Sequence, residues 1–135
     1  MVVKHSAKLL LLDSENNALI LRRSESHPHI PLTSDLPGGE IESGETPAVA
    51  ACRETFEETG INLEESVMRQ IGKRQFKAFG REYDLYLFVA KVSERPDVKI
   101  SWEHDQYSWI PLDEVQNLDD GFQPLVTDYL KTNRA

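Results

Sequence analysis

The sequence has little cysteine, no long apolar run and fewer basic than acidic residues. Cys52 is the only cysteine, which excludes an internal disulfide and favours a reducing cytoplasm as the location. The longest apolar stretch, which ends at Leu12, is strand-sized and far too short to span a bilayer. Residues 1–5 lack a basic region followed by an apolar core, so we expect no export signal.

The acidic balance bears on the partners of the chain. Fifteen Lys and Arg face 23 Asp and Glu, giving a net charge of −8. Nonspecific nucleic-acid binding depends on Lys and Arg that neutralise phosphates, so we expect no duplex nucleic acid as a partner, and no membrane. A small phosphorylated ligand stays possible, because carboxylates hold divalent cations and these bind phosphates. We expect a small-molecule nucleotide as partner, and a monomer or homodimer.

Length and patterning predict one mixed α/β domain over residues 1–135, with no internal repeat. A polar turn at residues 13–17 joins the first two expected strands and predicts a hairpin. Thr46 is suited to cap a helix, Pro47 suits its first turn and Gly60 supplies its end. The expected strands cover residues 2–12, 18–22, 68–78, 82–92 and 107–110. The expected helices cover residues 46–59, begin within 111–115, and close the chain over 123–132.

Three acids mark one face of the helix over residues 46–59. Glu54, Glu57 and Glu58 are spaced i, i+3, i+4, so their side chains share this face. We expect the opposite face to pack against a sheet; its residues are Ala48, Val49, Cys52 and Phe56.

Converging carboxylates repel one another unless a cation lies between them. Magnesium prefers hard oxygen ligands and also engages substrate phosphates, so a metal site would explain the acidic face. The alternative is a solvated acidic surface, which is the commoner origin of charge runs.

The residues around these acids favour the metal site. Gly39 is followed after five residues by Glu45, and after seven more by Arg53-Glu54-Thr55-Phe56-Glu57-Glu58-Thr59-Gly60-Ile61. This segment is similar to the signature of the Nudix hydrolases, with seven specified identities at the right spacings. Thr55 departs from the aliphatic residue that is commoner there. The resemblance implies an α/β/α sandwich with a mixed β-sheet.

The resemblance also assigns roles to residues. Glu54, Glu57 and Glu58 would bind Mg²⁺, with Mn²⁺ as a substitute, and one of them would serve transiently as a base. The carbonyl of Gly38 is a further candidate ligand. We expect Glu45 and Arg53 to form a charge-assisted pair that orients the carboxylates.

A later segment, residues 102–109, resembles the family region that supplies another acid. Glu103 is the first candidate to complete the metal site or to take a proton from water, and Asp105 is the second. Both also fit the description of ordinary loop acids. His104 is suited to acid–base chemistry near neutral pH, although a structural role is commoner for such a residue.

Weaker candidates lie elsewhere. Several basic side chains could bind a terminal phosphate, although each alone is typical of a solvated charge: Arg22, Arg23, Lys73, Arg74 and Lys77. Three aromatic residues could stack on a base, although packing is the default: Phe79, Tyr83 and Trp102. The segment His27-Pro28-His29 could chelate a metal but lacks a third ligand. Cys52 is expected to act as a small buried hydrophobe.

The resemblance implies a pyrophosphohydrolase, an enzyme that cleaves the phosphoanhydride bond of a nucleoside diphosphate linked to another moiety. A nucleoside triphosphate, including modified or oxidised ones, is the leading substrate class. Dinucleoside polyphosphates, nucleotide sugars, a dihydroneopterin triphosphate and capped RNA stay open, and the absence of a proline within residues 72–78 disfavours ADP-sugars. A nucleotide-sensing domain without turnover is the rival, although such domains usually lose signature acids.

Overall fold

The elements of the fold follow the order expected from the sequence. The computed structural model describes residues 3–26, 33–78, 80–118 and 123–133. Its strands are β1 (Val3–Leu12), β2 (Asn17–Arg23), β3 (Ser34–Asp35), β4 (Gly38–Glu40), β5 (Arg69–Ala78), β6 (Arg81–Lys91) and β7 (His104–Pro111). Its helices are α1 (Pro47–Thr59), the 3₁₀ turn η1 (Glu65–Val67), α2 (Leu112–Val115) and α3 (Gln123–Asn133).

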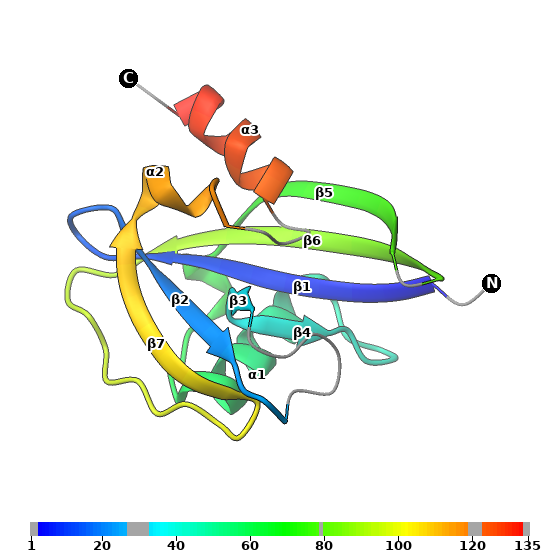
Figure 1. The fold of residues 1–135 in the computed structure, drawn as a ribbon, viewed down its shortest axis with the longest axis horizontal. Coiled ribbons are helices and arrows are strands. Elements are labelled where there is room, and N and C mark those ends of the chain that lie inside the picture. The colour runs from blue at the N-terminus through cyan, green and yellow to red at the C-terminus, as the bar shows by residue number, and fades with distance from the viewer. Residues whose placement is uncertain (1–2, 27–32, 79, 119–122, 134–135) are drawn as a thin grey trace.

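The described strands form one mixed sheet in the order β3-β2-β1-β6-β5, with β4 on β1 and β7 on β2. β1 and β6 run parallel in register from Val3↔Glu82 to Leu12↔Lys91, and the other pairs are antiparallel. The predicted β1–β2 hairpin pairs only at Leu12↔Ala18. Beyond this pair the two strands diverge, because β2 pairs with β7 while β4 lies against residues 6–8 of β1 (Figure 1).

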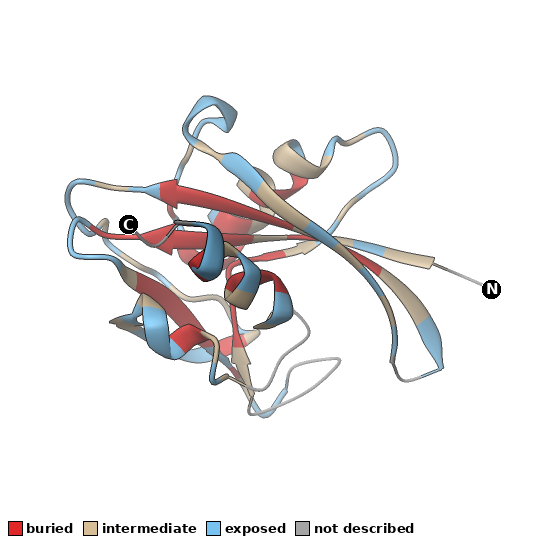
Figure 2. Cartoon of the chain, turned by 90° about the horizontal axis from the view of Figure 1, so that it is seen from above, coloured by how far each residue is buried: buried red, intermediate tan, exposed pale blue. Residues whose placement is uncertain are grey.

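Helices cover both faces of the sheet. Alternate residues of β1 serve the two sides, since Leu10 and Leu12 pack with α2 and α3, whereas Leu9 and Leu11 pack with α1. Burial is concentrated in the strands between the helices (Figure 2). The two cores confirm the expected α/β/α sandwich. Truncating one such buried leucine to alanine would remove about 2–5 kcal/mol of stability.

Local chemistry sets the ends of α1. The hydroxyl of Thr46 accepts a hydrogen bond from the amide of Val49 at 3.2 Å, and Pro47 occupies the first turn. Gly60 ends the helix in a left-handed conformation (φ 74°), where its amide donates to the carbonyl of Phe56 at 2.8 Å. The predicted helix is therefore confirmed, and the cap interactions fix where it begins and ends. Along the described parts of the chain, no helix has both the length and the apolar character needed to cross a membrane.

Candidate functional site

The face of α1 that packs on the sheet differs from the prediction. Val49 is 38% and Phe56 54% exposed, so the expected burial of these two side chains is wrong. Ala48 packs against the core and Cys52 is partly buried. The buried residues are Ala50, Ala51, Thr55, Glu58 and Thr59. Small side chains let the helix approach the sheet closely. Glu58 lies on this buried face of the helix, where its carboxylate contacts the backbone of β4.

Arg53 binds Glu45 through two parallel contacts, as predicted. Its Nε lies 2.7 Å from Oε2 of Glu45, and its Nη2 lies 2.9 Å from Oε1. These hydrogen bonds hold the pKa of Glu45 at about 2. Nη2 also donates to the carbonyl of Glu40 at 3.0 Å. The guanidinium thereby ties the loop before α1 and the end of β4 to the helix.

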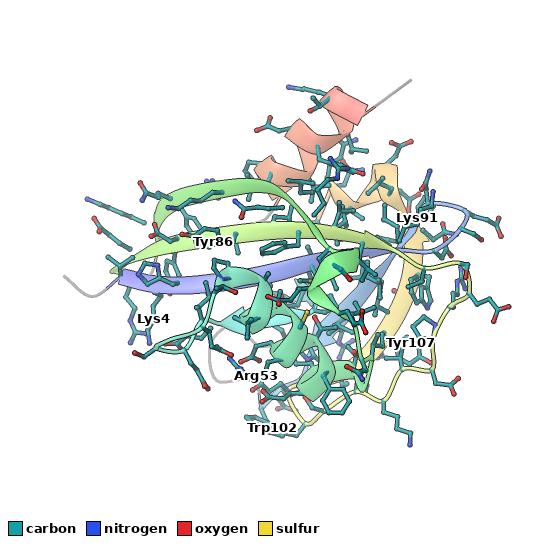
Figure 3. The ribbon with its side chains drawn as sticks, turned by 180° about the vertical axis from the view of Figure 1, so that it is seen from behind. Lys4, Arg53, Tyr86, Lys91, Trp102 and Tyr107 are labelled. Carbon is teal, nitrogen blue, oxygen red and sulfur yellow. The ribbon has the colours of Figure 1, made fainter. Side chains whose placement is uncertain are left out.

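The same guanidinium gathers two of the predicted metal ligands. Nη1 of Arg53 donates to Oε1 of Glu54 at 2.9 Å and to Oε2 of Glu57 at 3.2 Å. The carboxylate of Glu54 lies against Gly39, where an added Cβ would meet its carboxyl carbon and Oε2 at 2.7 Å. Gly39 is therefore required for the position of Glu54. Figure 3 views the molecule from the side of α1 and shows Arg53 on this side.

Glu58 is the most buried of the three signature glutamates. It is 4% exposed, and its Oε1 accepts a hydrogen bond from the amide of Gly38 at 2.8 Å. Burial raises the pKa of Glu58 to about 8, although the charge of Lys8 acts in the other direction. Burial also raises the pKa of Glu54. The surroundings of Glu54 and Glu58 thus disfavour the ionised forms of both carboxylates.

The carbonyl of Gly38, a predicted metal ligand, accepts a hydrogen bond from Nζ of Lys8 at 3.0 Å. The same ammonium contacts Oδ1 of Asp35 at 2.9 Å and the carbonyl of Leu36 at 3.3 Å. Sequence reasoning missed both Lys8 and Asp35. The signal for Lys8 was a charged residue between the buried apolar residues Ala7 and Leu9, since a buried charge requires a partner.

Asp35 is the centre of a buried ion network. Lys8 and Nη2 of Arg23 approach its Oδ1 at 2.9 and 3.1 Å, and Nε2 of His104 lies 3.1 Å from its Oδ2. Burial alone would raise the pKa of Asp35, but Lys8, the His104 hydrogen bond and Arg23 hold it well below its usual range. Because Asp35 is ionised, Nε2 of His104 donates this hydrogen bond. This buried hydrogen bond to Asp35 supports the structural role for His104.

Asp35, Glu58 and His104 also form a group with metal-ligand atoms within 4.8 Å of one another. Nδ1 of His104 lies 3.9 Å from Oε2 of Glu58. The group could hold a metal ion, although Asp35 is already bound by two cationic side chains. Among the described residues, Glu54, Glu57 and Glu103 do not belong to this group.

The donors on α1 fit a hard divalent cation. Glu54, Glu57 and Glu58 present carboxylate oxygens, the ligands that magnesium prefers. Arg53 is shared among Glu45, Glu54 and Glu57, so one positive charge faces three carboxylates. The raised pKa values of Glu54 and Glu58 have the same main cause, burial, and a cation bound at these carboxylates would oppose it.

The loop that carries Glu103 lies beside the end of α1. The amide of Ser101 donates to the carbonyl of Glu58 at 3.1 Å, and the carbonyl of Glu103 accepts from the amide of Ser24 at 2.8 Å. Glu103 is partly buried. Asp105, the second candidate, forms an ion pair with Arg22 at 3.0 Å. This contact occupies Asp105 at the surface, whereas Glu103 lies on the turn that is hydrogen-bonded to the end of α1.

The predicted phosphate-binding residues are not brought together. Arg22 and Arg23 lie on β2, and Arg23 is buried in the Asp35 network, where it also donates to Thr33 at 2.9 Å. The other three lie on β5, at the far end of the sheet order. There Lys73 lies 5.0 Å from the ring centre of Tyr86, Arg74 lies 4.6 Å from that of Phe76, and Lys77 pairs with Glu82 at 3.7 Å.

The weaker candidates have diverse surroundings. Tyr83 stacks on Phe76 with ring centres 5.2 Å apart, whereas Trp102 is 66% exposed on the side of α1 (Figure 3). Burial raises the pKa of Cys52, as expected for a thiol that packs as a hydrophobe. Phe79 and the segment His27-Pro28-His29 lie outside the described residues.

Comparisons with known proteins find similar sequences and structures. The bis(5'-nucleosyl)-tetraphosphatase (asymmetrical) of Rattus norvegicus is 31% identical over 85 residues, which cover 61% of this chain and 58% of the relative. The 8-oxo-dGTP diphosphatase of Escherichia coli (strain K12) is 41% identical over 51 residues, which cover 38% of this chain and 40% of the relative. The chain thus spans less than two thirds of these two curated relatives.

The similarity in structure extends along nearly the whole chain. The crystal structure of the MutT protein from Methanosarcina mazei Go1 superposes with a TM-score of 0.86 at 28% identity, covering 98% of this chain and 96% of that one. The profile described as the NUDIX domain matches residues 4–129. The chain therefore belongs to the Nudix family.

Proposed function

We propose that the protein is a Mg²⁺-dependent pyrophosphohydrolase that cleaves a phosphoanhydride bond of a nucleoside diphosphate linked to another moiety. The observation that carries the proposal is the placement of the signature glutamates. Arg53 contacts both Glu54 and Glu57, and the buried carboxylate of Glu58 accepts a hydrogen bond from the amide of Gly38. Family membership supports the same chemistry. Mn²⁺ is expected to substitute for Mg²⁺.

The residues of the chain would act by binding and by proton transfer. A bound divalent cation supplies positive charge for the phosphates and lowers the pKa of an attacking water. Water attacks one phosphorus, the bond from that phosphorus to the bridging oxygen breaks, and no covalent enzyme intermediate forms. One of the signature glutamates would take the proton from this water, as the family resemblance implies. Outside the signature, Glu103 is the first candidate to take this proton or to complete the metal site, and Asp105 is the second.

A nucleoside triphosphate, including oxidised ones, is the proposed substrate class. The relative named 8-oxo-dGTP diphosphatase, at 41% identity, supports this choice. Dinucleoside polyphosphates are the second candidate, because the match to the relative named bis(5'-nucleosyl)-tetraphosphatase extends over 85 residues rather than 51. We place the enzyme in the cytoplasm, as a monomer or homodimer without duplex nucleic acid as partner.

The test is an assay of phosphate and pyrophosphate release from about fifty nucleotide derivatives with Mg²⁺. We expect Glu57→Gln and Glu58→Gln to lower the rate by roughly 100-fold, a loss typical of a catalytic electrostatic group. Glu65→Gln is the matched control, since Glu65 lies on η1 outside the site. Equal rates for wild type and both site variants would exclude the proposed reaction. Tight calorimetric binding of a nucleotide without any hydrolysis would favour the nucleotide-sensing domain instead.

A further inference from the structure

The ammonium group of Lys8 lies where the family resemblance places a metal ion, at the carbonyl of Gly38. Nζ of Lys8 is 3.0 Å from this oxygen, 3.3 Å from the carbonyl of Leu36 and 2.9 Å from Oδ1 of Asp35. These three oxygens match the three N–H donors of an ammonium group. The lysine side chain is 14% exposed, so protein atoms rather than water surround the charge.

The contacts of Gly38 make this arrangement specific. Its amide donates to Glu58 at 2.8 Å and its carbonyl accepts from Lys8 at 3.0 Å. The backbone of one residue thus contacts both an acidic and a basic side chain. An added Cβ at Gly38 would lie 2.1 Å from the carbonyl oxygen of Ala7, which shows how tightly β4 is held against β1. This close pairing leaves Gly38 little room to move relative to β1.

The ammonium of Lys8 is paired with a buried carboxylate. Its Nζ lies 2.9 Å from Oδ1 of Asp35, which also contacts Arg23 at 3.1 Å. A divalent ion and an ammonium repel each other at the short distances from one carbonyl oxygen at which each binds. Binding of one cation at the Gly38 carbonyl therefore disfavours binding of the other.

We propose that Lys8 occupies the Gly38 carbonyl in place of a metal ion, so that the divalent cation is held by the glutamates of α1 without this oxygen. The inference rests on the proposed function and narrows its ligand set. In this arrangement Lys8 is a positioning residue, a fixed cation that ties the strand containing Gly38 and Gly39 to β1. The departure from the family expectation comes from a side chain on β1, outside the signature.

Replacing Lys8 tests the proposal through cation binding by the resting protein. An ammonium attracts one carboxylate with unit charge but repels a divalent ion twice as strongly at the same distance. We expect Lys8→Met to raise the affinity for Mn²⁺ on the order of tenfold, because the repulsion is lost and the carbonyl is freed. The control is Lys4→Met on the same strand, where the lysine contacts the exposed carboxylate of Glu40 at 3.4 Å.

Free Mn²⁺ measured by electron paramagnetic resonance gives the affinities of all three proteins. Tighter binding by Lys8→Met alone supports the proposal. Equal or weaker binding by Lys8→Met, with saturable uptake by wild type, overturns it while leaving the proposed metal site intact. No saturable uptake by any of the three proteins overturns both.

A second measurement needs no variant. Gly38-Gly39 is the only pair of adjacent glycines among the seven in the chain. Glycine labelled with ¹³C at the carbonyl and with ¹⁵N therefore gives one carbonyl–amide correlation, which reports the Gly38 carbonyl. We expect saturating Mg²⁺ to leave this ¹³C resonance of the wild type at its metal-free position. A carbonyl shift that saturates with Mg²⁺ would show ligation and overturn the proposal, even if Lys8→Met fails to fold.

Discussion

Arg53 and Glu45 meet through two parallel hydrogen bonds, with Nε 2.7 Å from Oε2 and Nη2 2.9 Å from Oε1. The remaining nitrogen, Nη1, contacts Glu54 and Glu57, so the planar fork of the guanidinium aligns three acids at once. An ammonium group cannot reproduce this geometry, because it is a compact point charge without a fork.

Arg53→Lys is therefore predicted to lower nucleotide hydrolysis by about 10- to 100-fold, the usual effect of losing a residue that orients metal ligands. Steady-state kinetics with Mg²⁺ would measure this, and the decrease should include kcat. Arg81→Lys, at an exposed position where β6 begins, is the control and should keep the wild-type rate. An Arg53→Lys protein with wild-type kcat would show that the fork is not required.

The two adjacent glycines are predicted to fail in different ways. Gly39→Ala would place a Cβ 2.7 Å from the carboxylate of Glu54, a side chain that can rotate away, so the fold should survive while activity falls about 100-fold. Gly38→Ala would place a Cβ 2.1 Å from the backbone oxygen of Ala7 at a φ of +131°, so the fold itself should be lost or strongly destabilised. Thermal melts and activity assays on both proteins would separate these outcomes. Similar melting temperatures for the two variants would contradict the prediction.

Glu58 predicts a pH dependence of the metal-free protein. Burial raises the pKa of Glu58 from 4.5 to about 8, so the folded state binds the extra proton over this range. The free energy of unfolding should therefore fall as pH rises from 4.5 to 8, by roughly a few kcal/mol. Urea denaturation in the presence of a chelator should show Glu58→Gln to be more stable than wild type above pH 8, with the difference shrinking toward pH 4.5. A difference that is constant with pH would rule out this origin.

Asp13 predicts a loss of stability in acid. Its Oδ1 accepts from the amides of Glu15 and Asn17 at 2.9 and 2.8 Å, and Arg95 donates to its Oδ2 at 2.8 Å. Although burial acts in the other direction, these bonds lower the pKa of Asp13 from 3.8 to about 2.

The stabilisation from Asp13 is complete above pH 3.8 and is lost as pH falls toward 2. Asp13→Asn should melt at a lower temperature than wild type at pH 6, and the two melting temperatures should converge near pH 2. Activity at pH 7 should be retained, because the turn lies at the far end of β1 from Gly38. Melting temperatures that stay equally separated at pH 6 and pH 2 would count against a titrating Asp13.

The sequence predicts the elements of this fold well where the signals are local. Thr46, Pro47 and Gly60 determine the ends of α1 through contacts within a few residues. The buried face of that helix was not predictable from apolar content, because Phe56 is exposed while Glu58 is drawn inward by the amide of Gly38, twenty residues away.

In the candidate site, too, local contacts could be predicted from the sequence and contacts between distant residues could not. The Arg53–Glu45 pair follows from a short spacing within the signature. The Asp35 network does not, since Lys8 and His104 reach Asp35 across separations of 27 and 69 residues, and only the pairing of distant strands brings them together. The parallel β1–β6 pairing is equally nonlocal, which is why the adjacent strands predicted a fuller hairpin than the one that forms.

The sequence positions of the residues that contact Asp35 determine when each of them is synthesised. Its lysine comes from β1 and its arginine from β2, but its histidine comes from β7, in the last third of the chain. A nascent chain that ends before β7 therefore exposes Glu58 without the imidazole beside it and leaves one oxygen of Asp35 without His104. The ribosome must deliver the chain through His104 before the charges beneath the acidic helix are fully matched.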